Sequence, residues 1–154
     1  MEWLAFIAHI ASALLAPVAF FGKRWAYVAF VVLGLLYFPL SVGCELNPRP
    51  CEWIFGPGLA VYSLTNVPHI VLMALFFVMT IAQFGYRLTW RTFGWSMLAV
   101  VVIGLLVELS EGVTGQHNCR MRDLIPDAAG GLLGAGLFYL AKWVWMKARR
   151  RNEK

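Results

Sequence analysis

Apolar residues along this chain occur in long runs that short polar segments separate. A membrane-spanning helix needs about 20 mostly apolar residues, and five segments approach or reach that length. They cover residues 3–21, 25–43, 66–84, 94–111 and 125–146. Between the second and third runs, closely spaced prolines and glycines predict a turn-rich outer loop over residues 44–65. The pattern predicts an all-α fold, a polytopic membrane helical bundle of five transmembrane helices formed by one domain, residues 1–154.

The composition supports a bilayer environment. Of the 154 residues, 60% are hydrophobic and only 14% are charged, which leaves too few polar side chains to cover the surface of a soluble domain. The formal net charge of +5 does not indicate a nucleic-acid partner, because the basic residues lie between apolar runs and not on one polar face. The lipid bilayer is the partner that the sequence predicts.

Basic residues mark alternate ends of the predicted helices. Lys23 and Arg24 separate the first two apolar runs, Arg87 and Arg91 separate the third and fourth, and a basic segment from Lys142 onward ends the chain. With five spans these groups share one side of the membrane, which the positive-inside rule makes cytoplasmic. We therefore expect the N-terminus outside and the C-terminus in the cytoplasm.

Three cysteines fall on the predicted outer face, where thiols can oxidise: Cys44, Cys51 and Cys119. The close spacing of Cys44 and Cys51 favours a disulfide between these two residues. Cys119 stays open as an alternative partner for either of them.

Four carboxylates are paired at the outer ends of the last two predicted helices. Glu108 and Glu111 are three residues apart and share a helix face. Asp123 and Asp127 are four apart and share a face where the last helix begins. Ionisable groups at membrane depth are costly and usually face a bundle interior or a cavity. We expect these acids to converge in the outer half of the bundle.

Histidines and arginines lie at the same predicted depth or next to it. His9 and His69 fall near the outer ends of the first and third helices. His117, Arg120 and Arg122 lie in the connection before the last helix, within reach of the acids. Together with the carboxylates they form the candidate site for a ligand or a cation.

Three interpretations of this outer cluster remain open. Histidine and carboxylate are ligand types for zinc or non-haem iron, with His9 and His69 as the metal candidates. Paired carboxylates can instead share a proton for acid–base or relay chemistry. The third interpretation is a structural polar cluster in which Arg122 neutralises Asp123 or Glu108. The residues identify no cofactor and no catalytic group.

The last predicted helix carries closely spaced glycines. Gly130 and Gly134 are four residues apart, a spacing that lets two helix backbones approach closely in a bilayer. The partner is either helix 94–111 of the same chain or a helix of another subunit, in a homo-oligomer or a larger complex.

The stretch from Glu108 to Gly134 reads ELSEGVTGQHNCRMRDLIPDAAGGLLG. It resembles the C-terminal signature of the VanZ-like membrane protein family. In that signature two polar residues three apart end one helix, and a basic loop leads to an Asp that opens the last helix. Glu108 and Asp123 occupy the first and the helix-opening positions, and Gly130 and Gly134 are the two glycines. Three features depart from the signature. Glu111 stands for the usual Gln and Asp127 for the usual Asn, and the loop arginine of the family has no exact counterpart, so that Arg120 or Arg122 would have to substitute.

The resemblance implies a multi-pass protein of the bacterial inner membrane with a polar site that faces the cell envelope. We expect this site to bind a polar or lipid-linked ligand or a cation, and enzymatic activity is the less favoured interpretation. Two alternatives are a non-catalytic accessory subunit of a larger membrane complex and a metal-dependent intramembrane hydrolase.

Overall fold

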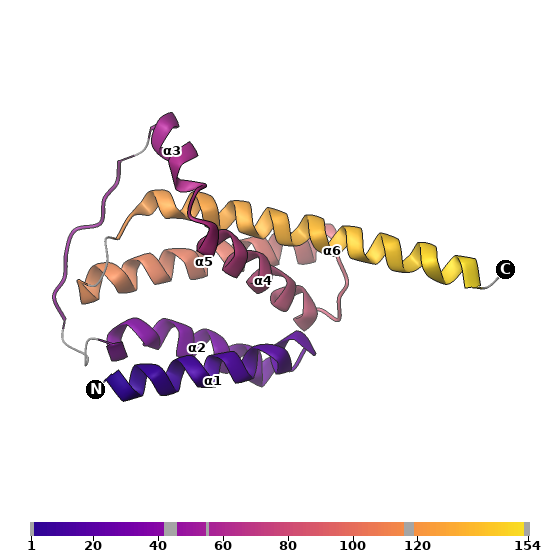
Figure 1. Cartoon of the computed structure of the whole chain (residues 1–154), viewed down its shortest axis with the longest axis horizontal. Coiled ribbons are helices and arrows are strands. Elements are labelled where there is room, and N and C mark those ends of the chain that lie inside the picture. The colour runs from indigo at the N-terminus through magenta and orange to yellow at the C-terminus, as the bar shows by residue number, and fades with distance from the viewer. Residues whose placement is uncertain (1, 42–45, 55, 116–118, 153–154) are drawn as a thin grey trace.

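The computed structural model describes residues 2–41, 46–54, 56–115 and 119–152. Within these ranges the chain is helical and forms no β-strand, which confirms the predicted all-α class. The elements are α1 (Glu2–Phe20), α2 (Arg24–Ser41), α3 (Pro57–Ser63), α4 (Val67–Gln83), α5 (Trp90–Thr114), the 3₁₀ turn η1 (Met121–Asp123) and α6 (Leu124–Asn152). Figure 1 shows the longer helices running roughly along one axis, with the C-terminal part of α6 projecting beyond the others.

Two helical stretches in the described chain are long and apolar enough to cross a membrane: α5, and η1 together with α6. The pair α3 and α4 passes the same test together, although the two helices are bent by 69° at their junction. The apolar parts of α1 and α2, Phe6–Phe20 and Arg24–Tyr37, are shorter. The helix α3 lies inside the segment predicted as loop, where Pro57 starts it at a position that loses no helical hydrogen bond.

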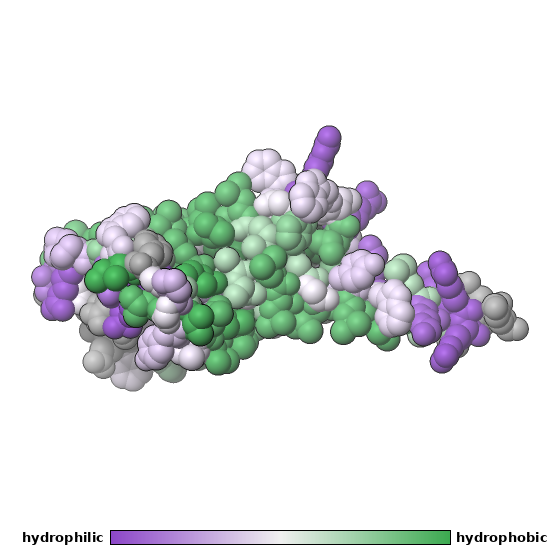
Figure 2. Space-filling model, turned by 90° about the horizontal axis from the view of Figure 1, so that it is seen from above, coloured by the Kyte–Doolittle hydropathy of each residue, from purple (hydrophilic) through white to green (hydrophobic). Residues whose placement is uncertain are grey.

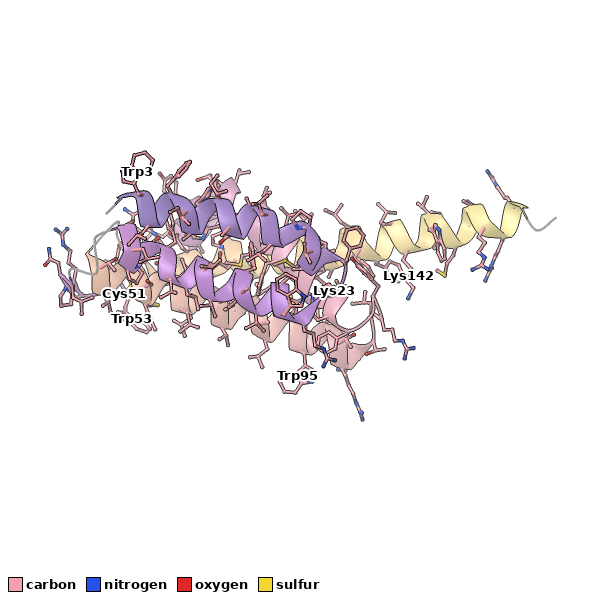
Figure 3. All side chains as sticks on the ribbon, turned by 90° about the horizontal axis from the view of Figure 1, so that it is seen from below. Trp3, Lys23, Cys51, Trp53, Trp95 and Lys142 are labelled. Atoms are coloured by element: carbon pink, nitrogen blue, oxygen red, sulfur yellow. A yellow bond between two sulfur atoms is a disulfide. The ribbon has the colours of Figure 1, made fainter. Side chains whose placement is uncertain are left out.

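The surface carries an apolar band between two polar ends. In Figure 2 hydrophobic side chains cover the middle of the molecule, and polar side chains gather at its two ends. Figure 3 places Trp3, Cys51 and Trp53 at one end, whereas Lys23 and Lys142 lie toward the other. Exposed leucines and valines in such a band match hydrocarbon, so the surface is that of a membrane protein.

The helix α4 is the centre of the packed core. Its side chains Met73, Phe76, Phe77, Met79 and Ile81 form most of the buried apolar cluster. α1 and α2 pack against each other as a hairpin, and both contact α4. α6 packs along α4 on the other side and also contacts α5 (Figure 1).

Glycines on α6 let its backbone approach α4 closely. A Cβ atom at Gly134 would lie 2.5 Å from the carbonyl oxygen of Ala74, and one at Gly130 would lie 2.9 Å from Cβ of Met73. The close packing predicted for these two glycines is therefore present within the chain. The helix that Gly130 and Gly134 contact is α4, and not the predicted helix 94–111. A different glycine of α6, Gly131, faces α5.

This packing predicts a sharp difference between two glycines on the same helix. We expect Gly134→Ala to lower the free energy of unfolding by about 1–3 kcal/mol, because the added methyl group would push α6 away from α4. Gly136→Ala is the matched control, since an added Cβ meets nothing within 4 Å there. Unfolding of both variants in mixed detergent, followed by circular dichroism, measures the difference. Equal losses would contradict the close α4–α6 contact.

Candidate functional site

The loop over residues 46–54 closes the C-terminal end of α5, which the sequence predicts to lie on the outer side of the membrane and which we call the outer end. Its backbone N–H groups at Asn47 and Arg49 donate to the carbonyl oxygens of Val113 and Gly112, at 3.2 and 2.8 Å. Gly115 ends α5 with a φ of 64°, a left-handed conformation that favours glycine. The loop thus satisfies carbonyls that the helix end leaves unpaired and becomes fixed over the outer face.

A disulfide joins this loop to the segment before α6. Cys51 is bonded to Cys119, with their Cα atoms 4.7 Å apart. The predicted Cys44–Cys51 pairing is therefore wrong, because Cys51 already has a partner, and Cys44 lies outside the described residues. Two backbone hydrogen bonds flank the disulfide: Glu52 N–H donates to Cys119 O at 2.9 Å, and Met121 N–H donates to Glu52 O at 3.1 Å. Segments that are far apart in the sequence are thus held in register.

Three predicted site residues meet beneath this closure. His69 from α4, Glu108 from α5 and Asp123 from η1 each offer one ligand atom, and these atoms lie within 4.8 Å of one another. Glu108 is buried, with only 1% of its surface exposed, whereas His69 and Asp123 are half-buried. We call His69, Glu108 and Asp123 the outer trio.

Asp127 supports the outer trio from the first turn of α6. Its Oδ1 atom lies 2.9 Å from Nδ1 of His69. Its Oδ2 atom is buried without a hydrogen-bond partner in the described structure and packs against Gly104 of α5, where any side chain would collide with it. The contact occupies Nδ1 of the imidazole and leaves Nε2 as the ring nitrogen available to a ligand.

The loop arginines pair with an acid that sequence reasoning missed. Glu52 forms ion pairs with both guanidinium groups: Nη1 of Arg122 lies 3.5 Å from Oε1, and Nε of Arg120 lies 3.6 Å from Oε2. The alternative in which Arg122 neutralises Asp123 or Glu108 is therefore wrong. Arg120 does reach Glu108, but through its backbone N–H, which donates to Oε2 at 2.7 Å. The one sequence feature that indicates a role for Glu52 is its position next to Cys51.

The remaining candidates lie apart from the outer trio or outside the described residues. Glu111 is half-buried one helical turn beyond Glu108. His9 is exposed on α1, with its ring 6.1 Å from that of Tyr37, and it is not part of the trio. His117 falls among residues that the structure does not describe.

The charge of the site follows from these contacts. Glu108, Asp123 and Asp127 bring three carboxyl groups around one imidazole, while the two nearby guanidinium groups are paired with Glu52. Carboxylates removed from water need a compensating charge or a proton. One imidazole and two carboxylates form a donor set for a divalent transition metal, and three protein ligands leave a coordination position open.

Comparisons of this chain with models of known protein families, with curated proteins and with solved structures found no match.

The disulfide assignment predicts a definite pattern of free thiols. Alkylation without reductant should label one cysteine in the wild-type protein, none in Cys44→Ser and two in Cys51→Ser. Mass spectrometry counts the labels. Loss of the disulfide should also destabilise the fold by about 4 kcal/mol in the chain-entropy model, because it closes a loop with a sequence separation of 68. Retention of a disulfide in Cys119→Ser would contradict the assignment.

Proposed function

We propose that this chain is a small VanZ-like integral membrane protein of the bacterial cell envelope that binds a divalent cation at its outer face. The observation that carries the proposal is the outer trio, in which three donor atoms from three helical segments lie within 4.8 Å of one another. Metal–ligand bonds of about 2.0–2.2 Å place tetrahedral donors about 3.3–3.6 Å apart. Small side-chain rotations therefore suffice to close the trio around an ion.

The charge balance supports a cation over an anion or a neutral ligand. Glu108 is buried, and the structure describes no arginine or lysine side chain in a salt bridge with it or with Asp123. A divalent ion supplies the two positive charges that these carboxylates need. Its binding free energy then offsets the desolvation that the empty site imposes on the fold.

The contact between Asp127 and His69 supports a transition metal over calcium or magnesium. Metal-bound imidazoles usually donate their second ring N–H to a carboxylate, which fixes the tautomer and makes the ligating nitrogen more basic. Asp127 is placed to accept that N–H from Nδ1 of His69. Calcium and magnesium prefer oxygen ligands throughout and gain nothing from an oriented imidazole.

The VanZ-like part of the proposal rests on where the signature residues lie. Glu108 and Asp123 are members of the outer trio, Asp127 holds His69, and Gly130 and Gly134 set the spacing of the helices beneath them. These five signature residues thus belong to one structural unit, which supports a shared binding role at the outer face; Glu111, the remaining signature position, lies one helical turn beyond Glu108.

We further propose five membrane spans, with the N-terminus outside and the C-terminus in the cytoplasm. α1 has 19 residues, which at 1.5 Å per residue gives about 28 Å, close to the thickness of the hydrocarbon core. The turn after α1 carries Lys23, which lies toward the same end as Lys142 (Figure 3), and Arg24 follows it as the first residue of α2.

Cysteine labelling tests this topology. In a Cys44→Ser background, Lys23→Cys should resist a membrane-impermeant maleimide in intact spheroplasts and react after permeabilisation. Arg49→Cys, in the outer loop, should react in both preparations. Labelling of Lys23→Cys in intact spheroplasts would overturn the five-span arrangement.

Metal analysis tests the cation site. We expect purified wild-type protein to hold about one Zn²⁺ per chain after loading and dialysis, measured by elemental analysis. His69→Gln, Glu108→Gln and Asp123→Asn should each weaken Zn²⁺ binding more strongly than Asp127→Asn, whose loss should be about 10–100-fold because it acts through His69. His9→Gln is the matched control and should bind Zn²⁺ as the wild type does.

A stability measurement separates loss of the site from loss of the fold. In metal-free buffer Glu108→Gln should unfold at the same temperature as the wild type or higher, because an amide at this buried position carries no charge to desolvate. Added Zn²⁺ should raise the unfolding temperature of the wild type and of His9→Gln but not that of Glu108→Gln. Equal Zn²⁺ content in His69→Gln and His9→Gln would refute the proposal.

A further inference from the structure

A small groove lies at the outer end of the bundle, between α3 and the start of α6. Its volume is about 290 Å³, and its lining residues are Gly56, Pro57, Ala60, Arg122 and Ile125. Four of these residues are apolar or lack a side chain, so Arg122 is the charged group of the lining. Trp53, three residues before Gly56 in the sequence, is exposed, as is common for tryptophan at the level of lipid headgroups.

The contact of Arg122 with its carboxylate partner is long for a guanidinium group that is so little exposed. Only 11% of its side chain is accessible, and its contact with Glu52 is 3.5 Å long, beyond the usual range of about 2.7–3.2 Å for an N–H···O hydrogen bond. Glu52 is shared with Arg120, whose Nε atom is buried without a hydrogen-bond partner in the described structure. Two guanidinium groups thus share one carboxylate, which leaves this ion cluster one positive charge in excess.

We propose that this groove binds an anionic phospholipid of the outer leaflet, with the lipid phosphate on Arg122. Arginine matches phosphate because its planar guanidinium donates two parallel charge-assisted hydrogen bonds. The apolar remainder of the lining suits the glycerol backbone and the first methylene groups of a lipid and disfavours a free ion. Glu52 is the competing partner that the phosphate displaces.

This lipid site is separate from the cation site, although Arg122 and Asp123 are consecutive in η1. Arg122 lines the groove beside α3, whereas Asp123 belongs to the outer trio. Each proposal can therefore be contradicted without affecting the other. Absence of bound metal would not change the groove, and equal binding of different lipids would not change the outer trio.

Native mass spectrometry of the purified full chain with short-chain lipids tests the proposal. Dioctanoyl phosphatidylglycerol, with a net negative headgroup, should bind at least about fivefold more tightly than dioctanoyl phosphatidylcholine. Arg122→Gln should weaken phosphatidylglycerol binding about 10–100-fold, the loss expected for a hydrogen bond to a charged group. Glu52→Gln should strengthen it severalfold, because it frees both guanidinium groups from their competitor.

Three further variants keep the test falsifiable if Arg122→Gln folds poorly. Ala60→Trp should fill the groove and reduce binding while leaving the ion cluster intact. Arg49→Gln removes an exposed arginine of the outer loop and should leave binding unchanged. Glu108→Gln should lose Zn²⁺ and keep the lipid preference. Equal affinity for the two lipids, or equal effects of Arg122→Gln and Arg49→Gln, would overturn the lipid site.

Discussion

The close approach of α4 and α6 is the constraint on which the rest of this structure depends. Hydrocarbon provides no hydrophobic force to press two helices together, so contact relies on backbones that fit closely. Gly134 and Gly130 meet α4 on successive turns, the first of them against Ala74. One turn further out, the same two helices bring Asp127 to His69 at 2.9 Å. The polar contact is therefore the outward continuation of the glycine packing, and a wider helix separation would break both.

A second constraint acts from the outer side and completes the site. Gly104 on α5 leaves room for the buried carboxylate of α6, so that three helices can converge. The Cys51–Cys119 disulfide then fixes the segment before α6, which places the backbone N–H of Arg120 on Glu108 at 2.7 Å. A covalent tie across a long loop restricts the unfolded chain more than the folded one. The closure can therefore hold polar groups at this end of the bundle without a large apolar core of its own.

The sequence predicts the helical class, the approximate helix ranges and the convergence of Glu108 with Asp123, because these depend on local periodicity and on chain direction through the bilayer. It does not predict features that depend on long-range register. The pairing of Cys51 with Cys119 and the contact of Glu52 with the arginines arise where the outer loop crosses the start of η1, and spacing along the chain carries no signal for that crossing. His9 is exposed and is not part of the trio. A predicted depth in the bilayer does not determine in which direction a side chain points around its helix axis.

The distribution of charge favours a binding site over a purely structural cluster of acids. Moving one carboxylate from water into a protein interior costs several kcal/mol, a large part of the roughly 5–15 kcal/mol by which a domain is stable. This chain places Glu108 and Asp127 at 1% exposure and half-buries Asp123. It also has two arginines within one loop of them, yet directs both guanidinium groups to Glu52. A structural cluster would use the available arginines on the buried acids. Both guanidinium groups pair instead with Glu52, which is half-buried, and this arrangement supports the proposal that a cation supplies the missing positive charge.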